Sequence, residues 1–204
     1  DQKNTGLGGA RNAGLCVATG EYIGFVDADD FVDCKMYETL CTVAQSNNAD
    51  VVICNSKFYP YPIKHKKIWF KEYTGDIDAY FLDRNVQPGN KIVHRKLLDQ
   101  INFRFFDKNG DGAYLNILLN AQKIITLPDY YYYFYRVGHN SMSLNYSIEH
   151  MKREVRNAEW QKTMIINSDY ADKLLSYGDY LIIYALLQLT TVSAKNGNKK
   201  EYNN

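Results

Sequence analysis

The sequence predicts an α/β fold, with a mostly parallel sheet flanked by helices and a helical C-terminal extension. Its first third alternates patterns of helix, strand, helix and strand, which is the order typical of a parallel sheet. From Ser147 onward the apolar residues recur at helical spacing. A length of 204 residues is enough for one sizeable core with an appendage.

The first elements are expected between residues 4 and 54. Helical spacing of apolar and small residues indicates a helix over Asn4–Thr19, and the apolar run Tyr22–Val26 predicts a buried strand. Asp33 is expected to cap a helix that ends near Asn47. A second buried strand is expected over Ala49–Cys54. Because a parallel sheet needs a strand before its first helix, we expect upstream strands that this sequence does not contain.

The later elements are less regular. A basic run, Lys64–Lys67, suggests an exposed hairpin tip between two aromatic strands. Further elements are expected in this order: a helix over Asp76–Leu82, a strand over Lys91–Val93, a helix over Gly112–Ala121, strands over Lys123–Thr126 and Tyr130–Val137, and two helical segments divided near Asn167–Tyr170. The last segment, Leu174–Val192, has an apolar face that could pack on the domain, lie on a membrane surface or form a dimer. Packing on the domain is the commonest of the three.

Composition and charge narrow the class of protein. The apolar fraction of 46% and the charged fraction of 23% are typical of a soluble globular protein. A net charge of +1 gives no electrostatic case for a nucleic-acid partner. The four cysteines form no CxxC pair, which favours free thiols in a reducing cytosol. No signal peptide or membrane-spanning run is visible, so we expect a cytoplasmic protein, with the inner face of the membrane as an alternative.

The acidic cluster Asp27-Ala28-Asp29-Asp30 directly follows the first predicted strand. Ligands of open α/β sheets bind at the carboxyl ends of the strands. Side chains alternate along a strand, so Asp27 and Asp29 would point the same way if the chain stays extended. Adjacent carboxylates then favour Mg²⁺ or Mn²⁺, with substrate phosphates completing the coordination. Asp30 is expected to cap the following segment, and an acidic capping loop without metal is the alternative reading of the whole cluster.

The glycine-rich start around Arg11 does not match a dinucleotide fingerprint, because Arg11 occupies the position of the third glycine. A helix with small residues and one arginine still suits a phosphate or base edge. The alternative, that Arg11 pairs with an acidic neighbour, is equally compatible with the residues.

Two further sites are weaker. Asp107–Gly112 matches the first half of a calcium loop, but Leu118 stands where the loop requires a glutamate. Asp111 precedes an apolar helical run and could be an N-cap or a catalytic carboxylate. His139 follows the tyrosine-rich strand in a segment rich in phosphate-binding side chains.

Taken together, the motifs resemble the family 2 glycosyltransferases, which have the GT-A fold, a Rossmann-like α/β architecture. Three segments carry the resemblance: Gly9-Ala10-Arg11-Asn12-Ala13-Gly14-Leu15, Ala18-Thr19-Gly20-Glu21-Tyr22-Ile23 and Phe25-Val26-Asp27-Ala28-Asp29-Asp30. Downstream, Asn90–Arg95, Gly110-Asp111 with Tyr114, and Tyr133–Ser141 resemble later parts of that family. The resemblance implies a partial GT-A domain over residues 1–145 and a helical extension over 146–204.

The resemblance implies an inverting transfer of a sugar from a nucleotide diphosphate, often UDP, to a glycan or lipid-linked acceptor hydroxyl. The residues that would contact the nucleotide-sugar are Arg11, Asn12, Asp27, Ala28, Lys91 and His139. Asp29, with Asp27, would hold the metal, and Asp111 would be the general base. Peripheral membrane association and a homodimer are further possibilities.

Two features depart from the family. Gly110 stands where the family has an acidic residue before the base, so Asp111 is assigned by its spacing to Tyr114. The family's first strand and its Asp-Asp-Gly-Ser segment are absent, which implies half of a nucleotide site and weak donor binding by this chain alone. The competing hypotheses are a nucleotidyltransferase with a related sheet, and a non-catalytic sugar- or calcium-binding module.

Overall fold

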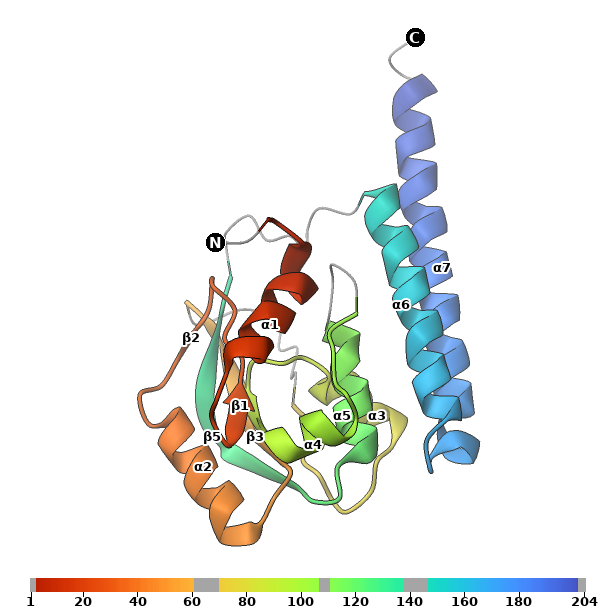
Figure 1. Ribbon diagram of the computed structural model, residues 1–204. Coiled ribbons are helices and arrows are strands. Elements are labelled where there is room, and N and C mark those ends of the chain that lie inside the picture. The colour runs from red at the N-terminus through yellow and green to blue at the C-terminus, as the bar shows by residue number, and fades with distance from the viewer. Residues whose placement is uncertain (1–2, 61–69, 107–110, 138–146, 202–204) are drawn as a thin grey trace. The chain divides into compact units, whose positions relative to one another are not determined.

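The computed structural model describes residues 3–60, 70–106, 111–137 and 147–201. The chain divides into two compact units, Asp1–His139 and Asn140–Asn204. The first holds the sheet, and the second is a pair of helices (Figure 1). The predicted domain boundary, between residues 145 and 146, lies outside the described residues.

The first unit is built on a five-stranded sheet with the order β1-β4-β3-β5-β2. The strands are β1 (Tyr22–Gly24), β2 (Phe31–Val32), β3 (Val51–Tyr59), β4 (Lys91–His94) and β5 (Ile124–Arg136). The helices of this unit are α1 (Gly6–Val17), α2 (Met36–Asn47), α3 (Ala79–Asn85), α4 (Arg95–Gln100) and α5 (Tyr114–Asn120), with a short 3-10 turn η1 (Asp111–Ala113) before α5. The predicted α/β class is confirmed. The structure adds β2 and α4, which the sequence analysis did not predict.

The sheet is mixed, whereas a mostly parallel sheet was predicted. β4 pairs antiparallel with both β1 and β3, β3 pairs parallel with β5, and β2 pairs antiparallel with β5. It follows that β1, β3 and β5 run in the same direction. The helical crossover from β1 to β3 was therefore predicted correctly, but β4 inserts antiparallel between these two strands and separates them.

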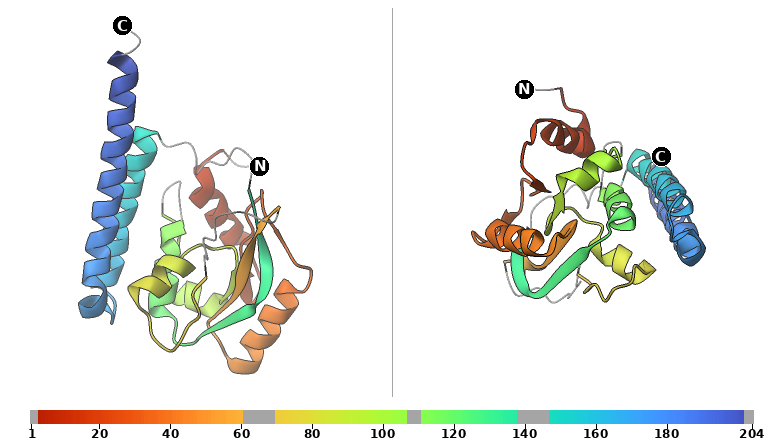
Figure 2. Two further views of the ribbon diagram at one scale, coloured as in Figure 1. Left: turned by 180° about the vertical axis from the view of Figure 1, so that it is seen from behind. Right: turned by 60° about the horizontal axis from the view of Figure 1, so that its bottom comes forward.

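Helix α2 packs on one face of the sheet, and α4 and α5 lie on the other (Figures 1 and 2). Because side chains alternate along a strand, β3 presents Val52 and Cys54 to α2. The buried cluster on this face consists of Met36, Leu40, Ala44, Ala49, Val52, Cys54, Ile92 and Tyr133. Burial raises the pKa of the Cys54 thiol to about 11, and all four cysteines are free.

Local chemistry sets the helix ends. Asp78 caps α3, because its Oδ1 accepts the amide of Phe81 at 2.6 Å. Asn48 ends α2 in the left-handed conformation, with φ of 50°. Asp33, which was expected to cap α2, lies two residues before the N-cap, which is Lys35, and its Oδ1 accepts the amide of Lys35 at 2.9 Å.

β5 is one long strand where two were predicted. Its register against β3 shifts between Cys54 and Ser56, where extra residues around Pro128 bulge out. Asn55 stabilises the bulge by donating its Nδ2 to the carbonyl of Pro128 at 3.0 Å. The predicted hairpin tip at Lys64–Lys67 lies outside the described residues.

The second unit is a helical hairpin of α6 (Ile148–Ile166) and α7 (Ala171–Glu201). Ser147 caps α6 by accepting the amide of His150 at 3.0 Å. The buried residues of the hairpin include Met151, Ala158, Ile165, Leu174, Tyr177 and Ala185. The single apolar face expected for α7 is not found, since Leu175 and Leu186 are exposed while Leu174 is buried. None of the described helices is long and apolar enough to cross a membrane.

Candidate functional site

The acidic cluster forms a tight turn after β1. The amide of Asp30 donates to the carbonyl of Asp27 at 3.0 Å, which closes a four-residue turn over Asp27–Asp30. The extended alternation on which the prediction for Asp27 and Asp29 depended is therefore not present. Ala28 and Asp29 are exposed at the tip of the turn, and Asp27 and Asp30 are half-buried at its ends.

Arg11 holds the first carboxylate of this turn. Its Nη2 lies 2.6 Å from Oδ1 of Asp27, and its guanidinium lies over the ring of Phe105 at 5.3 Å. The Arg11 side chain is only 6% exposed, whereas that of Asp27 is 33% exposed. The structure thus gives Arg11 the acidic neighbour that was the alternative reading of this residue, and Asp27 keeps one side toward solvent.

Asn12 ties α1 to the segment that follows α4. Its Nδ2 donates to the carbonyl of Phe105 at 3.0 Å, and its Oδ1 accepts the amide of Phe105 at 2.8 Å. Both ends of the side chain therefore bind the backbone of one residue, as the backbone of a neighbouring strand would. The role in donor binding predicted for Asn12 stays a prediction; in the structure its amide fixes the backbone beneath the site.

An aromatic cluster joins the acidic turn to the segment that carries Asp111. Phe25, two residues before Asp27, meets Phe105 at 5.1 Å and Tyr114 at 6.3 Å between ring centroids. Tyr114 opens α5, directly after η1, and is fully buried. Edge-to-face contacts of this kind favour a fixed geometry. The two carboxylate-bearing segments are thus held by one rigid core, although they are far apart in sequence.

Lys91 lies beneath the same cluster. It is fully buried in β4, where its Nζ donates to the carbonyl of Gln87 and, at 2.7 Å, to Oδ1 of Asn90. The ammonium lies over the ring of Tyr114 at 5.4 Å. Lys91 thus contacts the first residue of α5. The contact with a nucleotide that was predicted for Lys91 stays a prediction.

Asp30 and Tyr133 form a contact that the sequence analysis missed. Oδ2 of Asp30 accepts the Tyr133 hydroxyl at 2.5 Å, so Asp30 binds β5 and does not act as the cap that was predicted. Burial raises the pKa of the Asp30 carboxyl, while hydrogen bonds from Tyr133 and from the amide of Arg136 act in the opposite direction. Burial also raises the pKa of Tyr133, which keeps its hydroxyl protonated as the donor.

The remaining predicted residues are only partly described. The backbone of Asp111 begins η1, at the start of the helical segment that contains Tyr114, while its side chain lies outside the described residues. His139 lies entirely outside them.

The donor set around the turn fits a divalent cation that is shared with a ligand. Among the described residues no group of three or more His, Cys, Asp or Glu side chains could enclose a metal. Magnesium, however, commonly takes one or two carboxylates and completes its coordination with phosphates and water. Exposed Asp29, next to half-exposed Asp27, meets that requirement.

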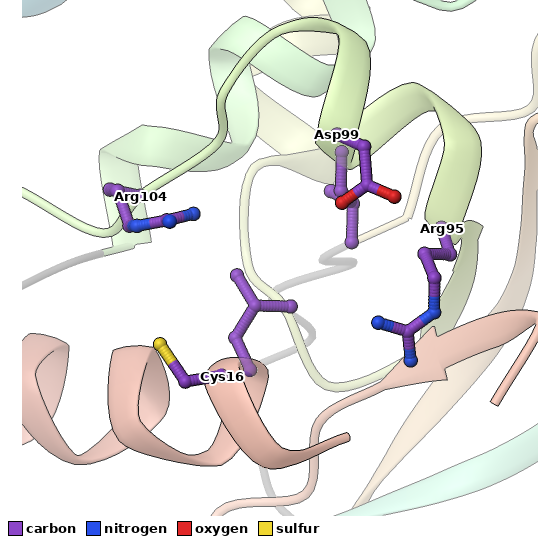
Figure 3. Close-up of a pocket in the computed structure, with 6 residues that line it drawn as sticks. Cys16, Arg95, Asp99 and Arg104 are labelled. Carbon is purple, nitrogen blue, oxygen red and sulfur yellow. The ribbon is translucent and has the colours of Figure 1, made fainter. Parts of the chain in front are cut away.

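A separate pocket of about 280 Å³ lies at the C-terminal end of α1 (Figure 3). It is lined by Leu15, Cys16, Arg95, Leu98, Asp99 and Arg104. Arg95 and Arg104 reach into it from opposite sides (Figure 3). Arg95 also donates to the carbonyls of Ala18 and Gly20, at 2.5 and 2.7 Å, where the chain enters β1. The acidic turn follows the opposite end of β1, so this pocket is not part of the candidate site.

The partly buried Arg11–Asp27 pair is expected to contribute to the free energy of unfolding. Arg11→Ala is expected to lower the free energy of unfolding by about 1.5–3 kcal/mol, because a partly buried charged hydrogen bond is lost. Arg11→Lys should lose less, since the charge remains but the forked geometry does not. Urea unfolding followed by circular dichroism measures both.

The matched control is Lys162→Ala. Lys162 and Asp179 also lie 2.6 Å apart, but their side chains are 28% and 52% exposed. An exposed pair contributes about 0–1 kcal/mol. Equal losses from Arg11→Ala and Lys162→Ala would contradict the structural importance of the buried pair.

Comparison with known proteins places the chain among sugar transferases. The sequence model described as "Glycosyl transferase family 2" matches residues 1–102, which is half of the chain. A cholesterol galactosyltransferase of Borreliella burgdorferi is 31% identical over 174 residues, covering 74% of this chain and 48% of the relative. The glycosyltransferase GlyA of Streptococcus pneumoniae is 26% identical over 217 residues, covering 97% of this chain and 30% of the relative.

Solved structures show the same fold. The crystal structure of S. aureus TarS 1–349 in complex with UDP-GlcNAc superimposes with a TM-score of 0.69 at 22% identity, covering 95% of this chain and 55% of that one. The chain thus spans about half the length, or less, of these known proteins.

Proposed function

This chain belongs to glycosyl transferase family 2, and we propose that it transfers a sugar from a nucleotide-diphosphate sugar to an acceptor hydroxyl. The expected donor is a UDP-sugar, and the expected acceptor is a glycan or a lipid-linked saccharide in surface polysaccharide synthesis. The complex of the structural neighbour TarS with UDP-GlcNAc supports the donor class. The proposed location is the cytoplasm, at the inner face of the membrane if the acceptor is lipid-linked.

The observation that carries the proposal is the geometry of the acidic turn. Asp29 is exposed at the tip of the turn. Arg11 orients the neighbouring Asp27, because its Nη2 lies 2.6 Å from Oδ1 of Asp27. Phe25 and Tyr114 bring the segments of Asp27 and Asp111 onto one aromatic core. The proposed sugar transfer requires both a metal–diphosphate site and a carboxylate base.

In this proposal Asp29, with Asp27, holds Mg²⁺ or Mn²⁺. When bound, the ion neutralises the charge that develops on the leaving diphosphate. Arg11 fixes the orientation of Asp27, and through it the position of the diphosphate. Ala28 lets the backbone of the turn approach the donor, because it has no side chain beyond Cβ.

Asp111 is the proposed general base. It takes the proton from the acceptor hydroxyl as the oxygen attacks the anomeric carbon, and the bond from that carbon to the diphosphate breaks. Attack on the face opposite the leaving group inverts the anomeric configuration, by the geometric logic of inverting glycosidases. His139 is proposed to contact the diphosphate of the donor.

The test uses the protein in its natural full length, incubated with a glycan or lipid-linked saccharide as acceptor and with UDP-glucose, UDP-galactose or UDP-N-acetylglucosamine as donor. We expect UDP release with at least one donor, its loss in EDTA and its return with added Mn²⁺. Proton NMR of the product should show the anomeric configuration opposite to that of the donor. Absence of UDP release with every donor and acceptor would refute the transferase, and a product of retained configuration would refute the single displacement.

A further inference from the structure

Asp30 binds the acidic turn to β5 through two hydrogen bonds. Its Oδ2 accepts the hydroxyl of Tyr133 at 2.5 Å, and its Oδ1 accepts the amide of Arg136 at 2.8 Å. The oxygen of the same Tyr133 hydroxyl accepts the amide of Asp27 at 3.5 Å. One hydroxyl therefore contacts both ends of the turn that carries Asp29.

The Tyr133 side chain is itself rigidly held. It is 5% exposed and belongs to the core cluster beneath α2. A Cβ at Gly89 would lie only 2.4 Å from Cζ of the ring, so the backbone of Gly89 closely approaches the ring on one side. The backbone of Tyr133 is paired on both sides, with Val32 of β2 and with Ser56 of β3. Because the ring is held in this way, its hydroxyl can hold a surface turn in a fixed position.

The two ends of the turn are thus held from different elements. Asp27 is held by Arg11 of α1, and Asp30 is held by Tyr133 and Arg136 of β5. Both oxygens of Asp30 accept hydrogen bonds from β5, which directs them away from the exposed tip. Asp30 is therefore not arranged as a third metal ligand, although it is adjacent in sequence to the proposed one.

We propose that Asp30 and Tyr133 are positioning residues for the metal–diphosphate site. They fix the turn so that the Asp29 carboxylate is presented in one orientation, and they contact neither the cation nor the donor. The inference rests on the proposed function, because it presumes that Asp29 holds the cation. Residues that orient metal ligands in this way typically contribute about 10- to 100-fold to metal affinity or activity.

The test measures Mn²⁺ binding and turnover separately. Electron paramagnetic resonance of free Mn²⁺, with UDP present, gives the affinity of the full-length protein for the ion independently of catalysis. Tyr133→Phe removes one hydroxyl and should weaken Mn²⁺ binding about 10- to 100-fold. The turnover of Tyr133→Phe should recover partly at high Mn²⁺. Asp30→Asn should weaken binding less than Asp30→Ala, because Asn keeps an oxygen for the amide of Arg136.

The matched control is Tyr132→Phe. Tyr132 is the preceding residue of β5, and its hydroxyl accepts that of Thr39 at 3.4 Å, on α2 and away from the turn. Its loss should leave Mn²⁺ affinity unchanged. Thermal unfolding of each variant separates a loss of fold from a loss of position, and Asp30→Asn, which is nearly isosteric, gives a second variant if Tyr133→Phe unfolds.

The outcomes distinguish this inference from the proposed function. If Tyr133→Phe and Asp30→Ala bind Mn²⁺ as tightly as Tyr132→Phe while Asp29→Asn does not bind it, the positioning role is wrong and the metal site stands. If the unsubstituted protein binds no Mn²⁺ in the presence of UDP, the metal site of the proposed function is wrong, and the positioning role is wrong with it.

Discussion

Asp29→Asn is expected to reduce metal-dependent turnover by roughly 100- to 1,000-fold. The side chain is exposed at the tip of the turn, next to a carboxylate that Arg11 already neutralises in part. An amide oxygen is a weaker ligand than a carboxylate, and a loss of about 3–4 kcal/mol of stabilisation of the leaving diphosphate corresponds to that factor. Steady-state assays of the full-length protein at several Mn²⁺ concentrations measure the effect.

The control for the loss of one negative charge is Asp33→Asn. Asp33 lies just beyond the turn, and its Oδ1 accepts the amide of Lys35, a bond that Asn can also make. We expect wild-type turnover from this variant. If Asp29→Asn binds Mn²⁺ as tightly as the unsubstituted protein, or if Asp33→Asn loses as much activity as Asp29→Asn, then Asp29 is not a metal ligand and the turn contributes only bulk charge.

The local parts of this fold were predictable because their signals are short in sequence. The helical spacing before Gly20 and the apolar run ahead of Asp27 gave α1 and β1 nearly at their observed bounds. The acidic cluster was found for the same reason, since its residues are consecutive. Family membership was recognisable from these same segments, which lie within the part of the chain that the family model matches.

The parts that were missed depend on contacts between distant segments. Nothing near β4 indicates that it will insert antiparallel between β1 and β3, because strand direction is fixed by the partners and not by the strand's own residues. Tyr133 is one of several tyrosines in the run from Tyr130 to Tyr135, and pairing with Asp30, 103 positions away, is what distinguishes it. The predicted alternation of side chains beyond β1 was also wrong, because the strand ends at Gly24 and the acidic residues form a turn.

Asp111→Asn is expected to reduce turnover by roughly 100- to 10,000-fold, which is the usual contribution of a general base. Asp111 begins η1, and Tyr114 fixes this segment to the aromatic core that also holds Phe25. Because the base acts on the acceptor, the KM for the donor and the affinity for Mn²⁺ should stay unchanged.

The control, Asp107→Asn, separates this base from a calcium loop. A calcium module would use Asp107 and Asp111 together, so both substitutions would weaken Ca²⁺ binding to a similar extent and neither would alter sugar transfer. A transferase needs the carboxylate of Asp111 alone, so Asp107→Asn should keep its turnover while Asp111→Asn loses it. Equal behaviour of the two variants would exclude Asp111 as the base, and Ca²⁺ binding lost in both would favour the module. The two sites thus report on different steps: Asp29 on departure of the diphosphate, and Asp111 on attack by the acceptor.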